Sequence, residues 1–353
     1  MQKNVHGGDV YRYRDCIDFS ANCNPLGTPE GVKRAIVQAV DGLADYPQVG
    51  YEPLRRAIAA SEGVSDNQVV CGNGAAELIF SLCLAIKPQK ALVLAPTFAE
   101  YEQALKSVDC EVQHYTLKED CGFCMQDDFL NALSGNLDMV FICNPNNPTG
   151  VLTEREFLLK ILDGCRSKGI FVVVDECFQD FISDPDDYTL KDQIFTYDNL
   201  FILKAFTKRY AIAGVRLGYG ISGDESLLTK MSLVTQPWNV SSIAQAAGVA
   251  ALVENQYVTE ARELIFKEAD YLRGEMQRLG VKLYDSKANY IFFKGPENLF
   301  EEFISKGIIV RDCSNYPGLG AGYYRIAVKK HEENMKFVQA LEIIMDEHRN
   351  RGE

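Results

Sequence analysis

The sequence predicts an α/β protein with two domains: a large domain with a mostly parallel central sheet flanked by helices, and a smaller α+β domain. Three observations lead to this prediction. Short apolar runs alternate with segments of helical spacing through the middle of the chain, which is typical of a buried, mostly parallel sheet. Near residue 240 the pattern changes to longer helices and short strands. The length of 353 residues is sufficient for two domains.

The large domain is expected to span residues 37–245. Its apolar runs are short and nearly continuous, as in strands buried on both faces. Strands are therefore predicted at residues 68–71, 90–94, 139–143, 170–174, 200–203 and 216–221. Between them, apolar residues recur with helical spacing, which predicts helices such as residues 75–85, 99–107, 153–168 and 225–234.

The smaller domain is expected to span residues 246–353. Around and within it, helices are predicted at residues 241–253, 258–279, 298–306 and 332–349, and strands at residues 281–284, 290–293, 308–310 and 324–328. Residues 1–36 carry several glycines, prolines and asparagines, which favour irregular structure. We expect this segment to form an N-terminal arm that joins the small domain.

Composition and charge argue against several classes of function. The chain has 36 basic and 49 acidic side chains, a net charge of −13 and no basic stripe, so neither nucleic acid nor an anionic membrane is an expected partner. The N-terminus lacks the apolar core of a signal peptide, and no apolar run approaches the roughly 18 residues of a membrane span. Eleven cysteines and four histidines, without framework or ligand spacing, fit a cytoplasmic protein without a metal site.

The candidate functional residues follow the predicted strands, where the carboxyl ends of a parallel sheet meet. Gly72-Asn-Gly-Ala-Ala-Glu77 closes one strand and opens a helix. Its glycines let the backbone approach an anion, and the free N–H groups of the first helical turn point toward that anion. Taken alone, this segment could also be a simple strand-to-helix turn.

Three further loops carry polar or charged side chains. The segment Asn144-Pro-Asn-Asn-Pro-Thr-Gly150 has an ordinary loop composition and could be structural. Asp175 and Glu176 end an apolar strand, and a carboxylate at the mouth of a buried sheet needs a partner, such as a protonated heterocyclic nitrogen. Lys208 follows another strand, with Arg216 eight residues beyond it. Alone, this lysine could simply be solvated.

In this order, the segments resemble the class I and II aminotransferases, which are pyridoxal-5′-phosphate (PLP) enzymes of fold type I. The resemblance extends from about residue 6 to residue 330. It rests on the glycine-rich turn, the aromatic Phe98 after Pro-Thr, the Asn-Asn-Pro-Thr-Gly loop, the Asp-Glu pair, Thr207-Lys208 and Arg216. It implies the PLP-dependent transferase fold type I and a PLP cofactor.

The resemblance assigns roles around that cofactor. Lys208 would bind PLP covalently and then transfer protons at the substrate. Asp175 would keep the ring nitrogen protonated, so that the ring can accept electrons. The remaining contacts that the family implies are the ring stack of Phe98, a hydrogen bond from Asn147 to the phenolic oxygen, and phosphate contacts from Gly74, Ala75, Ala76, Thr207 and Arg216.

Two positions carry further expectations. Tyr51 resembles the tyrosine that reaches the cofactor phosphate from the partner subunit, so we expect a homodimer. Position 205 is Ala, where relatives usually carry a hydroxyl that contacts the phosphate. Loss of one hydrogen bond costs ~1 kcal/mol, or somewhat more for a charged acceptor. We therefore expect weaker PLP retention but an active enzyme.

Two subgroups of the family are similar to this chain: the histidinol-phosphate aminotransferases and the L-threonine-O-3-phosphate decarboxylases of corrinoid (cobalamin) biosynthesis. Three features favour the decarboxylases. The opening segment carries His-Gly-Gly and Asp-Phe-Ser-Ala-Asn, Phe178 stands where aminotransferases have a tyrosine, and residues 310–325 resemble the segment that closes over the substrate. The decarboxylase reaction gives (R)-1-amino-2-propanol phosphate, and the histidinol-phosphate type of transamination is the alternative.

Both subgroups act on a small phosphorylated substrate. The resemblance to the decarboxylases implies that His6, Asn22 and Arg311 bind the substrate phosphate. Arg325 resembles the arginine that the wider family uses for the substrate carboxylate. Because this arginine could serve either reaction, its presence does not discriminate between them.

Two rival classes have weaker support. Gly218-Tyr-Gly-Ile-Ser-Gly223 matches the dinucleotide-binding motif by letter, but it lies deep in the chain and lacks the acidic residue expected about twenty positions later. A non-enzymatic, aminotransferase-like ligand-binding module would normally carry an added DNA-binding segment. Such a module would also have no need to retain Lys208, Asp175 and Arg325 together. We therefore expect an enzyme.

Overall fold

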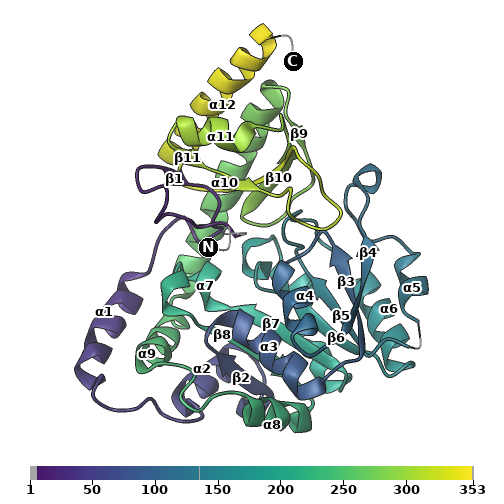
Figure 1. Cartoon of the computed structure of the whole chain (residues 1–353). Coiled ribbons are helices and arrows are strands. Elements are labelled where there is room, and N and C mark those ends of the chain that lie inside the picture. The colour runs from purple at the N-terminus through teal and green to yellow at the C-terminus, as the bar shows by residue number, and fades with distance from the viewer. Residues whose placement is uncertain (1–5, 135, 352–353) are drawn as a thin grey trace.

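A computed structural model describes residues 6–134 and 136–351 and contains a seven-stranded sheet in the large domain (Figure 1). The strand order is β2-β8-β7-β6-β5-β3-β4. All neighbouring strands are parallel except β8, which is antiparallel to both β2 and β7. The strands are β2 (Val69–Gly72), β3 (Lys90–Ala95), β4 (Glu111–Thr116), β5 (Met139–Cys143), β6 (Phe171–Asp175), β7 (Leu200–Ala205) and β8 (Gly218–Ser222).

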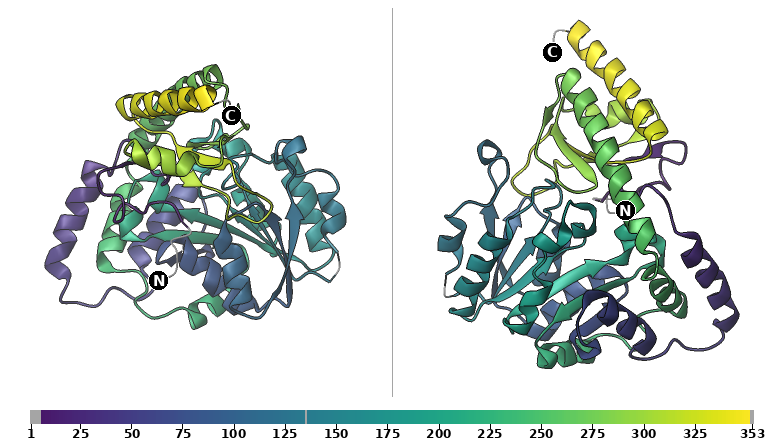
Figure 2. Two further views of the ribbon diagram at one scale, coloured as in Figure 1. Left: turned by 45° about the horizontal axis from the view of Figure 1, so that its top comes forward. Right: turned by 180° about the vertical axis from the view of Figure 1, so that it is seen from behind.

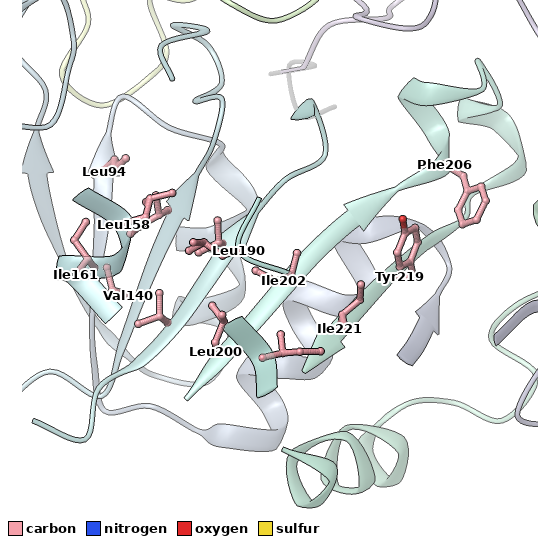
Figure 3. Close-up of a cluster of buried hydrophobic side chains, with 14 of the residues drawn as sticks. Leu94, Val140, Leu158, Ile161, Leu190, Leu200, Ile202, Phe206, Tyr219 and Ile221 are labelled. Atoms are coloured by element: carbon pink, nitrogen blue, oxygen red, sulfur yellow. The ribbon is translucent and has the colours of Figure 1, made fainter. Parts of the chain in front are cut away.

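Helices cover both faces of this sheet. The helices of this part of the chain are α1 (Glu30–Ala39), α2 (Glu52–Glu62), α3 (Gly74–Ile86), α4 (Ala99–Lys106), α5 (Phe129–Ala132), α6 (Arg155–Arg166), α7 (Phe206–Arg209), α8 (Glu225–Val234) and α9 (Ser242–Ala251). On one face, Val140 and Leu200 pack with Leu158 of α6 (Figure 3). On the other face, Phe141 and Phe201 pack with side chains of α3, α4 and α8. Burial of both faces explains why the strands are continuous apolar runs.

The small domain is built on a four-stranded antiparallel sheet in the order β12-β13-β10-β9. Its elements are α10 (Asn255–Arg278), β9 (Lys282–Leu283), β10 (Tyr290–Lys294), α11 (Leu299–Ser305), β11 (Ile308–Ile309), β12 (Arg311–Asp312), β13 (Tyr323–Ala327) and α12 (His331–Arg351). Helices α10 and α12 lie side by side and form one edge of the molecule (Figure 2). Their inner faces pack with β10 in a separate hydrophobic core.

The N-terminal segment attaches to the small domain. Strand β1 (Ile17–Asp18) pairs in parallel with β11, and the fully buried Phe19 contributes to the core of the small domain. Helix α1 begins within the predicted arm and packs against α9 of the large domain. The predicted limit at residues 245 and 246 falls inside α9. The domain limits remain a prediction.

The predicted strands and helices of the large domain lie close to the observed ones, but strand β4 and helices α1, α2, α5 and α7 were not predicted. Strand β4 has a polar sequence and many exposed side chains, because it pairs only with β3 at the sheet edge. Helix α1 buries only Val32 completely, so its apolar stripe is weak. Within the described ranges, no helix is long and apolar enough to cross a membrane. The same ranges contain no cluster of three potential metal ligands.

Candidate active site

A cavity of about 340 Å³ lies at the carboxyl ends of the parallel strands, below the small domain and the arm. Asp175 and Ala205 end their strands in its wall, and the small domain adds residues from β12 and β13. The cavity brings together most of the predicted site residues, which are His6, Asn22, Ala75, Ala76, Phe98, Asn147, Asp175, Thr207, Lys208, Arg216, Arg311 and Arg325. The predicted residues Gly74 and Tyr51 do not line it.

Asp175 is a buried carboxylate held by two neutral donors. Its Oδ2 accepts a hydrogen bond from the Tyr101 hydroxyl at 2.5 Å, and its Oδ1 accepts from the backbone N–H of Cys177 at 2.9 Å. Burial raises the pKa of Asp175, and only these two neighbours oppose the shift. A cationic group entering the cavity would therefore stabilise the ionised carboxylate.

The N-terminus of α3 forms a cradle for an anion. Gly74 has a φ of +75°, and a Cβ there would lie 2.3 Å from Nη2 of Arg216. A Cβ at Gly218 would lie 2.4 Å from the backbone nitrogen of Ala75. These two glycines let strand β8 and the Arg216 guanidinium approach the helix N-terminus closely. The arrangement combines a fixed positive charge with free backbone N–H groups, which is suited to a phosphate.

Arg325 is held in position by three polar groups. Its Nη1 donates to Oδ1 of Asn147, and its Nη2 donates to the carbonyl oxygen of Ser20 at 2.9 Å. With its amide oxygen turned to accept, Asn22 lies 3.2 Å from both Nε and Nη1 of Arg325. The guanidinium also lies 5.3 Å from the centroid of the Tyr290 ring. Because Arg325 occupies the Asn147 oxygen, the amide N–H₂ of Asn147 is available to donate into the cavity.

Arg311 lies directly across the antiparallel ladder from Arg325. Both arginines are buried, and both line the cavity. Arg311 donates through Nη1 to the carbonyl oxygen of Asp312 and through Nη2 to Oδ1 of Asn315 at 2.8 Å. Like charges at directly opposed positions of a sheet destabilise each other, and buried charges need compensation. This pair is therefore suited to ligands with more than one negative charge.

The chain matches the family model described as aminotransferase class I and II over residues 14–341. It belongs to this family. It is 36% identical to the threonine-phosphate decarboxylase of Salmonella typhimurium, over 97% of this chain and 96% of that protein. It is 30% identical to an adenosylcobalamin biosynthesis bifunctional protein of Leptospira interrogans, over 95% of this chain and 40% of that protein.

A solved member of the family has the same architecture. The histidinol-phosphate aminotransferase of Clostridium acetobutylicum superimposes with a TM-score of 0.87 at 31% identity, covering 93% of this chain and 99% of that structure. The fold class predicted from the sequence is therefore confirmed, and the chain is a PLP-dependent enzyme as predicted.

The residues around the cavity fit PLP. In the described part of the chain, the hydrogen-bond donors to Asp175 are the neutral Tyr101 and Cys177, so its carboxylate could pair with a protonated ring nitrogen. Arg216 and the N-terminus of α3 could hold the phosphate. Lys208 and Phe98 both line the same cavity, as a covalent anchor and a ring stack require. The individual roles of these residues remain predictions.

Several residues in or next to the cavity were missed in the sequence. Tyr101 is fully buried beside the cavity and donates to Asp175. Tyr316 lines the cavity, and the centroid of its ring lies 5.0 Å from the Arg311 guanidinium. Glu100 also faces into the cavity. Tyr101, Tyr316 and Glu100 carry no local sequence signal that identifies them.

Tyr51 lies outside the cavity of its own chain. Its hydroxyl donates to the carbonyl oxygen of Cys71 and accepts from the Cys71 N–H, both at 3.1 Å. Burial is the main cause of a raised pKa for this hydroxyl. The predicted contact with a partner's cofactor concerns a second chain and remains a prediction.

The segment Gly218–Gly223, which matches the dinucleotide-binding motif by letter, contains glycines that are needed for packing. Gly218 and Gly220 lie within strand β8, not at a strand-to-helix turn. A Cβ at Gly220 would lie 2.0 Å from the Phe201 ring. Close approach of neighbouring elements explains these glycines without a nucleotide.

Proposed function

We propose that this enzyme decarboxylates L-threonine O-3-phosphate to (R)-1-amino-2-propanol phosphate in corrinoid (cobalamin) biosynthesis. The observation that carries the proposal is the opposed pair of buried arginines, Arg311 and Arg325, in one cavity. L-Threonine O-3-phosphate brings a phosphate and a carboxylate on one small molecule, so it can compensate both guanidinium groups at once. The names of the Salmonella and Leptospira relatives support this substrate and this pathway.

Several residues of this chain would have separate roles in the reaction. Bound PLP supplies an electron sink for the bond that breaks at Cα. Arg325 and Arg311 would bind the carboxylate and the phosphate of the substrate and so fix its orientation in the cavity. Lys208 would donate a proton to Cα after carbon dioxide leaves. Asp175, positioned by Tyr101, would hold the proton on the ring nitrogen.

Transamination of the histidinol-phosphate type is the alternative. The similarity to the Clostridium enzyme supports it. In that reaction Lys208 would remove a proton from Cα, so the same residues would serve a different orientation of the substrate. Phe178 favours decarboxylation. It lines the cavity without a hydroxyl and packs edge-to-face on Tyr290, with the ring centroids 5.1 Å apart.

We also propose a homodimer in which Tyr51 reaches the cofactor of the partner subunit. Tyr51 does not line its own cavity. Five positions before Tyr51 in the sequence, Tyr46 is 79% exposed and stacks on the half-exposed Trp238, with the ring centroids 4.6 Å apart. Exposed apolar groups of this kind often mark an interface. A cytoplasmic location is supported by the eleven free cysteines, none of which forms a disulfide in the described structure.

The test is to incubate PLP-loaded protein with L-threonine O-3-phosphate, and to follow carbon dioxide together with the absorbance of the cofactor. We expect stoichiometric carbon dioxide without any keto acid, and recovery of the starting absorbance. L-Threonine serves as the control that lacks the phosphate. Absence of carbon dioxide, with conversion of the cofactor to its pyridoxamine form by histidinol phosphate, would assign the chain to the aminotransferases.

A further inference from the structure

The turn that carries Lys208 is bound by the N-terminal arm. Lys208 lies in the four-residue helix α7, and the last carbonyl groups of a helix need donors from outside its own hydrogen-bond ladder. Asn24 provides two such donors. Its backbone N–H donates to the carbonyl oxygen of Lys208 at 3.0 Å, and its Nδ2 donates to the carbonyl oxygen of Arg209 at 2.9 Å. The second of these hydrogen bonds joins positions 185 residues apart in the sequence.

The side chain of Asn24 is itself held in one orientation. It is buried, and its Oδ1 accepts a hydrogen bond from the backbone N–H of Leu26 at 3.0 Å. The carbonyl oxygen of Asn24 accepts from the N–H of Gly27 at 3.2 Å, which closes the turn. Because the amide oxygen and the amide nitrogen both have partners, Nδ2 cannot rotate away from the Lys208 turn without the loss of two hydrogen bonds.

The arm residues just before Asn24 contact the substrate side of the cavity. The carbonyl oxygen of Ser20 accepts from Nη2 of Arg325 at 2.9 Å. With its amide oxygen turned to accept, Asn22 lies 3.2 Å from the same guanidinium. Four residues span at most about 14 Å, so the segment from Ser20 to Asn24 is a short connection between Arg325 and the turn of Lys208.

We propose that Asn24 is a positioning residue that acts through Lys208, by fixing the backbone of the turn so that the amine is held at the place where PLP binds. There the amine would condense with the aldehyde of PLP, with loss of one water. A turn without the Asn24 donor would spend less time in the bonding position, and the covalent affinity would fall by that fraction. The inference rests on the proposed role of Lys208 as the covalent anchor.

The test compares two ligands on the full-length protein freed of PLP. One is PLP, and the other is pyridoxine 5′-phosphate, which has an alcohol in place of the aldehyde and cannot bond to Lys208. The ratio of their affinities, measured by equilibrium dialysis, isolates the contribution of the lysine, because both ligands share the phosphate contacts. We expect Asn24→Ser to lower this ratio by about 5- to 20-fold, and to change the affinity for pyridoxine 5′-phosphate by less than about two-fold.

Serine separates the positioning contact from the local turn of the arm. Its hydroxyl can still accept from the N–H of Leu26, as in other turns that serine stabilises, but it is one bond too short for the carbonyl of Arg209. Thr28→Val is the matched control. Thr28 Oγ1 also reaches from the arm to this part of the chain and donates to the carbonyl oxygen of Ala211 at 2.8 Å. The Thr28 variant should keep the affinity ratio of the wild-type protein.

A second variant covers the case in which Asn24→Ser proves unstable. Asn24→Asp keeps the shape of the side chain and the acceptor for Leu26, but it places a carboxylate oxygen against the carbonyl oxygen of Arg209. It should therefore lower the ratio at least as much as serine does.

The outcomes separate this inference from the proposed function. Equal losses of affinity for both ligands, an unchanged ratio, or an equal fall of the ratio in Thr28→Val would overturn the inference. A wild-type protein without preference for PLP, or a preference that Lys208→Ala retains, would overturn the role of Lys208 as well. A lowered ratio in Asn24→Ser, in a protein that releases no carbon dioxide from L-threonine O-3-phosphate, would support the inference and overturn only the decarboxylation.

Discussion

The two sides of the cavity are built in different ways. The cofactor side comes from one sheet, because Asp175 ends β6, Lys208 follows β7 and Arg216 precedes β8. The substrate side is assembled from distant parts of the chain. Arg325 of β13 donates to the carbonyl oxygen of Ser20 in the arm, across 305 positions of sequence. We infer that changes on the cofactor side abolish chemistry with every substrate, whereas changes on the substrate side alter which substrate is used.

Lys208→Ala should have the largest effect and would test the cofactor side. Loss of the amine removes both the covalent anchor and the proton donor, so turnover should fall by more than about 10³-fold with any substrate. Carbon dioxide release and transamination are both measured. The exposed Lys230 of α8 provides the control, since Lys230→Ala should keep full activity. Full turnover by Lys208→Ala would contradict the proposed mechanism.

Substitutions of Arg311 and Arg325 test the substrate side of the cavity. Arg311→Gln should raise the KM for L-threonine O-3-phosphate by about 10- to 100-fold, because a charge-assisted hydrogen bond to phosphate is lost. Arg325→Gln should also impair the orientation of the carboxylate, and so lower kcat as well. The measurement is steady-state kinetics of carbon dioxide release. Equal effects of both variants on KM and kcat would mean that the arginines do not have separate roles.

The difference between the cofactor side and the substrate side also explains which site residues the sequence could predict. Most cofactor-side residues lie in short motifs at strand ends, where a run of apolar residues and a polar loop suffice to place them. Asp175 is an example, because the buried strand before it could be predicted from its composition. Arg311 and Arg325 were identified only by resemblance. Their direct opposition depends on the register of β12 and β13, which no local pattern contains.

Elements were missed for a related reason. Strand β4 is at the sheet edge and therefore lacks the apolar run that marks the inner strands. Glu100 is an ordinary charged residue in the first turn of α4, and its contact with His6 depends on an arm almost a hundred positions earlier in the chain. Burial of a charged group follows from tertiary assembly, so composition and spacing give no sign of it.

Ala205→Ser should strengthen the cofactor side by a smaller amount. Ala205 ends β7 and lines the cavity, so a hydroxyl there could add one hydrogen bond to the cofactor phosphate. One such bond contributes ~1 kcal/mol, which is about five-fold in affinity. The dissociation constant of PLP, measured by equilibrium dialysis, is the readout. Thr207→Ala removes a hydroxyl from the same region and should therefore weaken the binding of PLP. An unchanged constant for Ala205→Ser would mean that position 205 lies out of reach of the phosphate.

A cluster of hydrogen bonds joins the large and small domains and allows the smallest prediction. Glu119 of the large domain accepts hydrogen bonds from four side chains of the small domain. Lys282 Nζ and Tyr284 Oη lie 2.6 Å from its Oε1, and Tyr323 Oη lies 2.6 Å from its Oε2. Lys294 Nζ lies 3.1 Å from Oε2. These hydrogen bonds, with that of Lys282 the largest cause, hold the pKa of Glu119 well below its usual range.

Glu119→Gln should therefore lower the thermal stability in a pH-dependent way. A carboxyl group with a lowered pKa in the folded state stabilises the fold above its unfolded value of about 4.3, and this stabilisation is lost as the pH falls toward the folded value. Because the cluster is partly exposed, we expect the variant to melt only about 1–2 °C lower at pH 7. The difference should shrink below about pH 4. A difference that stayed constant with pH would attribute the loss to packing, and the charge of Glu119 would then not contribute to holding the two domains together.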